Sequence, residues 1–235
     1  MMMFRSLIRS LAIFSLTLAV ACSSSRAAVR VPDPAVDTPL AKTSGSATLV
    51  LAGGCFWGVQ GVFQHVKGVT SVTSGYSGGA AGTAQYEMVS TGSTGHAESV
   101  KIVYDPAKVS LGQLLKVFFS VAHNPTELNR QGPDDGTQYR SVIFYGDDEQ
   151  KRIAQAYIDQ LNHAKVFDAP IVTQLTALKG FYAAEGYHQD YLKHHPYEPY
   201  IAFNDLPKIN HLQQTLPDLY VAKAVSFAPT TSASK

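Results

Sequence analysis

The segment that most constrains the fold is a glycine-rich turn between two apolar stretches. Residues 47–52 predict a short buried strand, and Gly53-Gly54-Cys55-Phe56-Trp57-Gly58 follows it directly. Beyond this turn, apolar side chains recur at helical spacing, at Val59, Val62, Phe63 and Val66. The chain must therefore pass from a strand into a helix through glycines, with Cys55 at the N-terminus of that helix.

The position of Cys55 indicates a chemical role. Backbone N–H groups without helical partners and the positive end of the helix dipole favour a thiolate at a helix N-terminus. An ordinary cysteine thiol has a pKa of about 8.5 and is only slightly ionised at neutral pH. We therefore predict that Cys55 is a nucleophile with an increased thiolate fraction. The alternative is a buried thiol that packs as a small apolar side chain.

The N-terminal residues indicate export. Arg5 and Arg9 precede an apolar run over residues 11–21 that is too short to span a bilayer but typical of a signal peptide. Ala19-Val20-Ala21-Cys22 resembles a bacterial lipobox, in which the cysteine is lipidated; ordinary cleavage and release is the alternative. Residues 22–46, rich in Ala, Ser and Pro, predict a flexible tether. We expect a protein of the bacterial cell envelope, in the periplasm, whose membrane attachment is a lipid anchor at Cys22.

The remaining sequence predicts one folded domain over residues 47–210 and a C-terminal tail over residues 211–235. The formal net charge of +1 gives no reason to expect a nucleic-acid partner. Strands alternate with helices, which indicates a sheet with helices packed on it. Strands are predicted at 47–52, 69–75, 97–104, 139–145 and 171–177, and helices at 56–66, 111–122, 148–164 and 183–194.

Three separated motifs carry a family resemblance. They are Gly54-Cys55-Phe56-Trp57-Gly58, the run from Tyr86 to Glu98 and the run from Asn129 to Ser141. In this order they resemble the A-type peptide-methionine sulfoxide reductase family, over about residues 47–210. The resemblance implies an α/β (α+β) fold, a two-layer sandwich with a ferredoxin-like core, a mixed sheet and long loops. It also implies reduction of methionine S-sulfoxide, free or in proteins, through a Cys55 sulfenic acid.

The resemblance assigns roles by motif position. Cys55 would be the nucleophile and Glu98 the acid, while Tyr86, Asp134 and Tyr139 would surround the substrate oxygen or order a water; Phe56 and Trp57 would form the methyl pocket, supported by His188. A carboxyl group kept protonated by burial can donate a proton to the departing oxygen. Without the motifs, Glu98 would be interpreted as a solvated acid, Trp57 as a core residue and Asp134 as a turn residue.

The resemblance implies no cofactor, and the spacing of His188, His194 and His195 predicts no metal site. Many members of the family carry resolving cysteines near the C-terminus, whereas no cysteine follows Cys55 here. We therefore expect an external thiol, such as a thioredoxin-like protein, to regenerate Cys55. The expected partners are this reductant, methionine sulfoxide and oxidised proteins, and the expected form is a monomer engaged in repair of oxidative damage.

Two other functions remain open at this point. Cys55, one of the eight histidines and an acid could form the triad of a cysteine hydrolase. The chain could instead be a non-catalytic envelope lipoprotein that binds oxidised peptides. Thiol-dependent turnover of a sulfoxide would distinguish the reductase from both.

Overall fold

The computed structural model describes residues 29–227, so the predicted signal peptide and Cys22 lie outside the described residues. A six-stranded sheet has the order β7-β6-β1-β3-β2-β8. Its strands are β1 (Ala47–Ala52), β2 (Val69–Ser77), β3 (Ala97–Tyr104), β6 (Val142–Tyr145), β7 (Gln174–Ala177) and β8 (Tyr182–Ala183). The β6–β7 pair is parallel and the other pairs are antiparallel, which confirms the mixed sheet. A separate two-stranded ladder joins β4 (Arg130–Gln131) to β5 (Asp134–Asp135).

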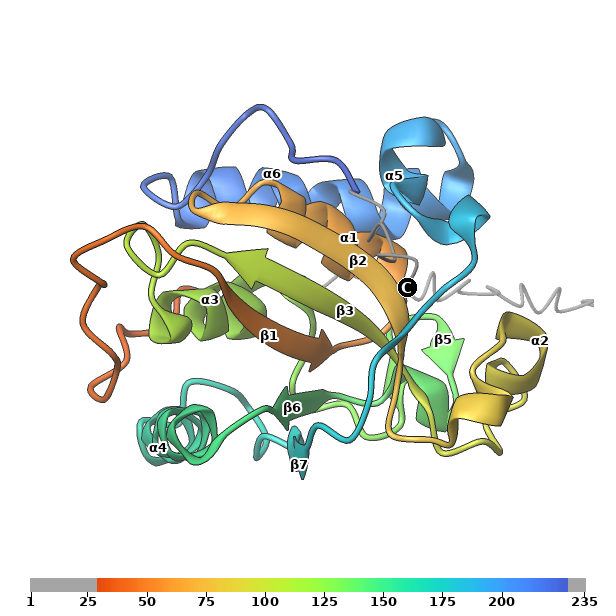
Figure 1. Cartoon of the computed structure of the whole chain (residues 1–235), viewed down its shortest axis with the longest axis horizontal. Helices are drawn as coiled ribbons and strands as arrows, with labels where there is room; N and C mark the ends of the chain where they lie inside the picture. Colours follow the sequence, from red (N-terminus) through yellow and green to blue (C-terminus); the bar gives the residue numbers. More distant parts are fainter. Residues whose placement is uncertain (1–28, 228–235) are drawn as a thin grey trace, which may run out of the picture.

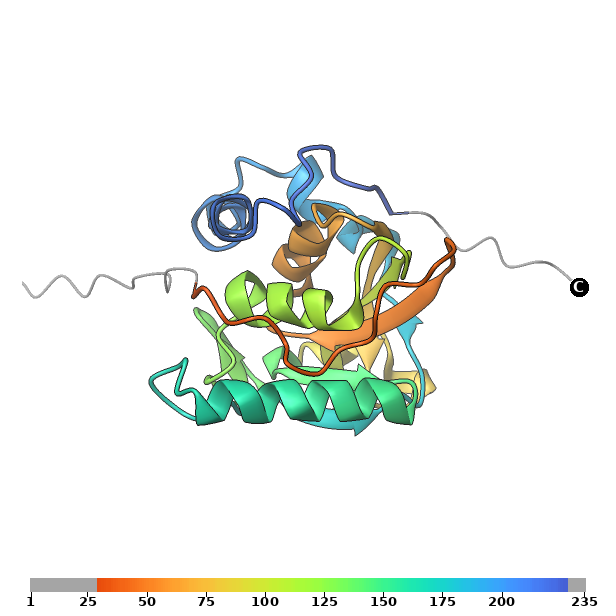
Figure 2. The same cartoon turned by 90° about the vertical axis from the view of Figure 1, so that its left-hand side faces the viewer.

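The helices form a second layer on the sheet (Figures 1 and 2). They are α1 (Phe56–Gln64), α3 (Leu111–Val117), α4 (Asp148–His163) and α6 (Leu206–Thr215), with the short helices α2 (Tyr86–Val89) and α5 (Tyr191–His194). A π-helical turn, Phe118–Ala122, prolongs α3, and another, Ile201–Asp205, precedes α6. Figure 1 shows α1 between β2 and α6. In residues 29–227, no helix is both long enough and apolar enough to cross a membrane.

Strand β1 is buried on both faces. Leu49 and Leu51 belong to the large core beneath the helices, whereas Val50 and Ala52 pack with Phe144 on the opposite face. This alternation follows from the two-residue repeat of a strand. A continuous apolar run such as residues 47–52 is therefore the expected sequence for this central position.

The register of the sheet determines what lies beside the turn after β1. Leu51 pairs with Val100 of the antiparallel strand β3. Because antiparallel partners run in opposite directions, Glu98 lies level with Gly53, just beyond the end of β1. On its other side Glu98 pairs with Tyr76 of β2. The sheet thus delivers a carboxyl group to the start of α1.

The predicted element boundaries differ from the structure mainly after residue 137. The strand expected from Tyr139 begins at Val142, because Thr137–Tyr139 forms a 3-10 turn, and the strand expected from Ile171 begins at Gln174. The expected helix over residues 183–194 is only a 3-10 turn followed by α5. The side chain of Gln189 accepts from the backbone N–H of Ser74 and donates to its carbonyl, and Asp190 adopts a φ of 53°. These constraints prevent a continuous helix.

The prediction of a flexible tether is wrong for residues 29–46, which lie along α3 and α4 (Figure 2). Val31 is only 1% exposed and belongs to the main core. Asp37 accepts from the N–H of Gly112 at 2.8 Å and from the hydroxyl of Ser110, which caps α3. The boundary expected at residue 210 also falls too early, because α6 continues to Thr215 and packs its Leu212 into the core.

This packing makes the N-terminal segment part of the stability of the domain. We expect Asp37→Ala to lower the free energy of unfolding by about 1–3 kcal/mol, because it removes the acceptor of a helix N-terminus. The matched control is Asp33→Ala, which breaks the ion pair with Lys116. The side chain of Asp33 is 84% exposed, so its loss should cost less than about 1 kcal/mol. Urea denaturation measures both; equal losses would contradict the assigned role of Asp37.

Candidate active site

The turn between β1 and α1 has a backbone geometry that requires glycine. Gly54 has a φ of +90°, and a Cβ at this position would stand 2.5 Å from the Cγ atom of Gln131. Cys55 follows as the residue that caps the N-terminus of α1, and it is 8% exposed. The turn thus fixes the thiol at a helix end against the loop that carries β4 and β5.

The predicted site residues come together around a cavity of about 170 Å³. It is lined by Cys55, Phe56, Trp57, Tyr86, Glu98, Asp134, Tyr139 and Tyr200. Seven of these were predicted from the motifs, although they come from four separated parts of the chain. His188, the eighth predicted residue, does not line the cavity but packs behind its aromatic wall.

Glu98 is a buried carboxyl group at the floor of this site. It is 3% exposed, and its Oε2 atom accepts from the backbone N–H of Phe56 at 3.0 Å. Burial raises the pKa of Glu98 to about 8, despite the opposing effect of that hydrogen bond. The carboxyl group is therefore protonated at neutral pH and can act as a proton donor. The interpretation of Glu98 as a solvated surface acid is wrong.

The thiol of Cys55 differs from its prediction. Burial raises its pKa well above the ordinary value, the nearby carboxyl groups of Glu98 and Asp205 add to the increase, and only the hydrogen bond from the N–H of Trp57 lowers it. Desolvation therefore outweighs the helix N-terminus. The predicted increase in thiolate is wrong for the substrate-free protein, which holds both the thiol and the carboxyl group neutral.

Aromatic rings form one wall of the cavity. Trp57 stacks on Tyr191 with ring centroids 3.8 Å apart, and its Nε1–H donates to Nδ1 of His188 at 3.1 Å. His188 also contacts the rings of Phe56 and Tyr86. Burial lowers the pKa of His188, so the ring is neutral and accepts the tryptophan N–H. His188 therefore holds the ring of Trp57 in place, and its supporting role toward the substrate stays a prediction.

Tyr200 is a lining residue that the motifs did not identify. Its hydroxyl donates to Oδ2 of Asp134 at 2.5 Å, and its ring makes an edge contact with Trp57. Burial raises the pKa of both Asp134 and Tyr200. No local sequence signal links residues 66 positions apart, so this contact is visible only in the fold.

A buried ion pair lies beside the first turn of α1 and was also missed. Asp205 is 0% exposed, and its Oδ1 atom accepts from the ammonium of Lys208 at 3.0 Å. A Cβ on Gly58 would stand 2.0 Å from that same oxygen, so the close approach needs glycine at this position. The sequence offers two local signals for this packing. They are Gly58, the second glycine of the motif, and Pro207 in the first turn of α6.

The histidines near Cys55 do not supply the base of a hydrolase triad. The ring nitrogens of His123 interact with the carbonyl of Phe118 and the hydroxyl of Ser141, and burial lowers the pKa of His123 to about 3. His188 is engaged by Trp57. Among the described residues, no group of three or more His, Cys, Asp or Glu side chains is arranged to hold a metal ion.

Comparisons with known proteins show the family of this chain. Residues 47–219 match the family model described as peptide methionine sulfoxide reductase. Peptide methionine sulfoxide reductase MsrA 2 of Mesorhizobium japonicum is 65% identical over 77% of this chain and 93% of its own length. MsrA 2 of Synechocystis is 52% identical over 83% of this chain and 92% of its own length.

Solved structures show the same relationship. Methionine sulfoxide reductase A of Corynebacterium diphtheriae is 33% identical, with a TM-score of 0.56, over 75% of this chain and 89% of its own. Reduced Mxr1 from Saccharomyces cerevisiae is 31% identical, with a TM-score of 0.58, over 68% of this chain and 94% of its own. The chain belongs to the peptide methionine sulfoxide reductase family, oxidoreductases that reduce methionine sulfoxide.

Proposed function

We propose that this enzyme reduces the S epimer of methionine sulfoxide, free or in proteins, through a sulfenic acid on Cys55. The observation that carries the proposal is the cavity in which a thiol, a protonated carboxyl group and aromatic walls converge. The apolar rings of Phe56 and Trp57 suit the methyl group and the soft sulfur. The carboxyl group of Glu98 and the hydroxyls of Tyr86 and Tyr139 suit the polar oxygen.

The reaction balances without a cofactor. The sulfur of Cys55 attacks the sulfoxide sulfur, which gains two electrons, and Glu98 protonates the sulfoxide oxygen as it loses its double-bond character. The oxygen and the proton from Glu98 end on Cys55, which has lost two electrons and is now a sulfenic acid, while the thiol proton of Cys55 restores the protonated Glu98; methionine leaves as the thioether. Because sulfoxide sulfur is pyramidal, a site with a separate methyl wall and oxygen side accepts one epimer.

Regeneration of Cys55 requires a thiol from outside the matched region. Between residues 47 and 219 Cys55 is the only cysteine. Enzymes of this family use no cofactor and draw electrons from a thiol reductant. We propose that an external thiol reduces the sulfenic acid directly, with a thioredoxin-like protein as one candidate donor.

We further propose that the enzyme repairs oxidised proteins in the bacterial cell envelope, as a monomer. The proposal rests on the apolar run over residues 11–21 and on the lipobox-like Ala19-Val20-Ala21-Cys22. In a bacterial host, the full-length protein should enter the membrane fraction and need detergent for extraction, whereas Cys22→Ser should not. Recovery of both forms in the cytosol would contradict the proposal.

A single turnover tests the proposed chemistry. The reduced enzyme, freed of added thiol, should release about one equivalent of methionine from the S epimer of methionine sulfoxide and none from the R epimer. One sulfenic acid should form on Cys55, detectable by trapping and mass spectrometry. A folded protein with an accessible thiol that releases no methionine from either epimer would overturn the proposal.

Two variants complete this test. Cys55→Ser should bind but not reduce the sulfoxide; binding without turnover in the parent enzyme would instead indicate a non-catalytic binding protein. Glu98→Gln should slow methionine release by a factor on the order of 10²–10⁴, the usual contribution of a general acid. An unchanged rate in folded Glu98→Gln would remove Glu98 from the mechanism.

The raised pKa of Glu98 also makes a prediction about stability. The folded protein holds this carboxyl group protonated up to about pH 8, whereas the unfolded chain ionises it near pH 4.5. The stability contributed by Glu98 is thus complete below pH 4.5 and is lost as the pH rises to about 8. As the pH rises through this range, the free energy of unfolding of Glu98→Gln should therefore increase relative to that of the parent, by up to about 1.4 kcal/mol per pH unit.

Urea denaturation at several pH values measures this difference. The matched control is Glu87→Gln, whose side chain is exposed on α2. It shows the effect of the same substitution at an exposed carboxyl group. A difference between Glu98→Gln and the parent that does not change with pH would show that Glu98 is ionised in the folded protein.

A further inference from the structure

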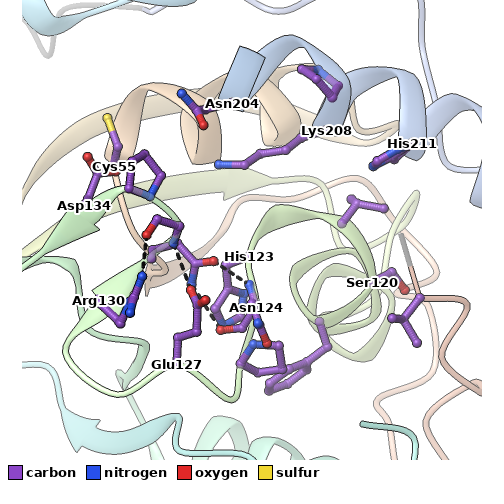
Figure 3. A pocket seen from close by; sticks show the side chains of 18 of the residues that line it. Cys55, Ser120, His123, Asn124, Glu127, Arg130, Asp134, Asn204, Lys208 and His211 are labelled. Atoms are coloured by element: carbon purple, nitrogen blue, oxygen red, sulfur yellow. Dashed lines mark hydrogen bonds between the residues drawn. The ribbon is translucent and has the colours of Figure 1, made fainter. Parts of the chain in front are cut away.

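A second, larger cavity meets the site at Cys55. Its volume is about 680 Å³, and it lies between the loop over residues 123–134 and the segment over residues 200–211 (Figure 3). Of the described residues, Cys55, Asp134 and Tyr200 line both cavities. Glu98 and the aromatic pair Phe56 and Trp57 line only the smaller one. The chemical steps proposed above therefore assign no role to the larger cavity.

The chemistry of the second half of the cycle gives this cavity a use. In the sulfenic acid, the oxygen bound to Cys55 lies where the sulfoxide oxygen was, beside Glu98 in the smaller cavity. A thiol that displaces this oxygen approaches the sulfur in line with the S–O bond, from the side away from the oxygen. The larger cavity also reaches Cys55 and, apart from Asp134 and Tyr200, is lined there by residues absent from the smaller cavity, so it offers a second route to the sulfur.

Two cations line the larger cavity. The side chain of Lys208 is 19% exposed, and its ammonium is held by the carboxylate of Asp205. Figure 3 shows Lys208 extending from α6 toward the end of the cavity that holds Cys55. Arg130 is exposed on the opposite wall. The lining acids Glu127 and Asp134 already accept hydrogen bonds, from a backbone N–H and from a tyrosine hydroxyl.

The size of the cavity favours a small reductant. Small-molecule sites usually have volumes of about 300–1,000 Å³, a range that includes this cavity of about 680 Å³. Cys55 is 8% exposed and lines this cavity. A small thiol can therefore enter the cavity completely.

On the basis of the proposed function, we propose that the larger cavity binds a small thiol that carries a carboxylate group, and that Lys208 attracts it. A nearby cation also favours the thiolate form of the incoming thiol. The thiolate forms an S–S bond to Cys55 and the S–O bond breaks, with the oxygen leaving as water after protonation by Glu98. A second thiol then attacks the mixed disulfide, which releases Cys55 as a thiol and the two small thiols as their disulfide.

The test compares two thiols that differ only in charge. Cys55 is first converted to the sulfenic acid with one equivalent of methionine S-sulfoxide. The rate of sulfenic acid loss is then measured with N-acetylcysteine, which carries a carboxylate, and with N-acetylcysteine amide, which is neutral. The rate ratio is the rate with N-acetylcysteine divided by the rate with its amide. This ratio should be about fivefold lower in Lys208→Gln than in the parent, the factor expected for one ion pair near a surface. Lys208→Arg, which keeps the charge, should restore the ratio.

The control is Lys151→Gln, which removes one positive charge from the exposed face of helix α4, outside the lining of both cavities. Its rate ratio should equal that of the parent. An unchanged ratio in Lys208→Gln, or an equal fall in Lys151→Gln, would overturn the inference. Should Lys208→Gln fail to fold, the same ratio measured in the parent enzyme at rising salt concentration carries the test, because salt weakens the attraction between solvent-accessible charges; a ratio that does not change with salt would then overturn the inference. The proposed function fails separately, because the sulfenic acid would then not form in the first step.

Discussion

The hydrogen bond from the backbone N–H of Phe56 to the carboxyl group of Glu98 joins the two elements on which the site depends. It connects the beginning of α1 to the beginning of β3, and the sheet register already places these ends side by side. The donor is one of the N–H groups that a helix N-terminus leaves without a helical partner. The helix gains an acceptor and Glu98 gains a fixed orientation in a place that excludes water. The acid and the thiol are thus positioned by one contact.

The segment between α5 and α6 closes this arrangement from the other side. Tyr200 bonds to Asp134, while Asp205 and Lys208 press against Gly58 in the first turn of α1. Asp205 is completely buried, and within residues 29–227 its second oxygen has no hydrogen-bond partner. Such a group is costly to bury. Its burial raises its own pKa and adds to the rise in the pKa of Cys55, so this segment shapes the electrostatics of the thiol as well as its access.

The sequence predicts the parts of this protein that depend on local pattern. The strand–glycine–helix turn and the central strands β1 and β3 lie where the pattern places them, because periodicity and glycine geometry determine them locally. Sequence patterns do not predict structure that is determined by contacts between residues far apart in the chain. Residues 29–46 have an unstructured composition but pack through Val31 and Asp37, and the bond between Tyr200 and Asp134 has no local signature. The thiolate prediction failed for the same reason, since burial is a property of the fold.

The raised pKa of Cys55 is compatible with its proposed role because the first half-reaction conserves protons. A thiol and a sulfoxide become a sulfenic acid and a thioether, so the proton of Cys55 need not reach solvent. A buried site that begins with the thiol and Glu98 both neutral avoids the cost of an unpaired charge. The sulfoxide oxygen then supplies a proton acceptor beside Glu98, and the thiol can transfer its proton as its sulfur attacks. Burial thus keeps Cys55 as a neutral thiol while the site is empty. The thiol gives up its proton only when a sulfoxide oxygen that can accept it is bound.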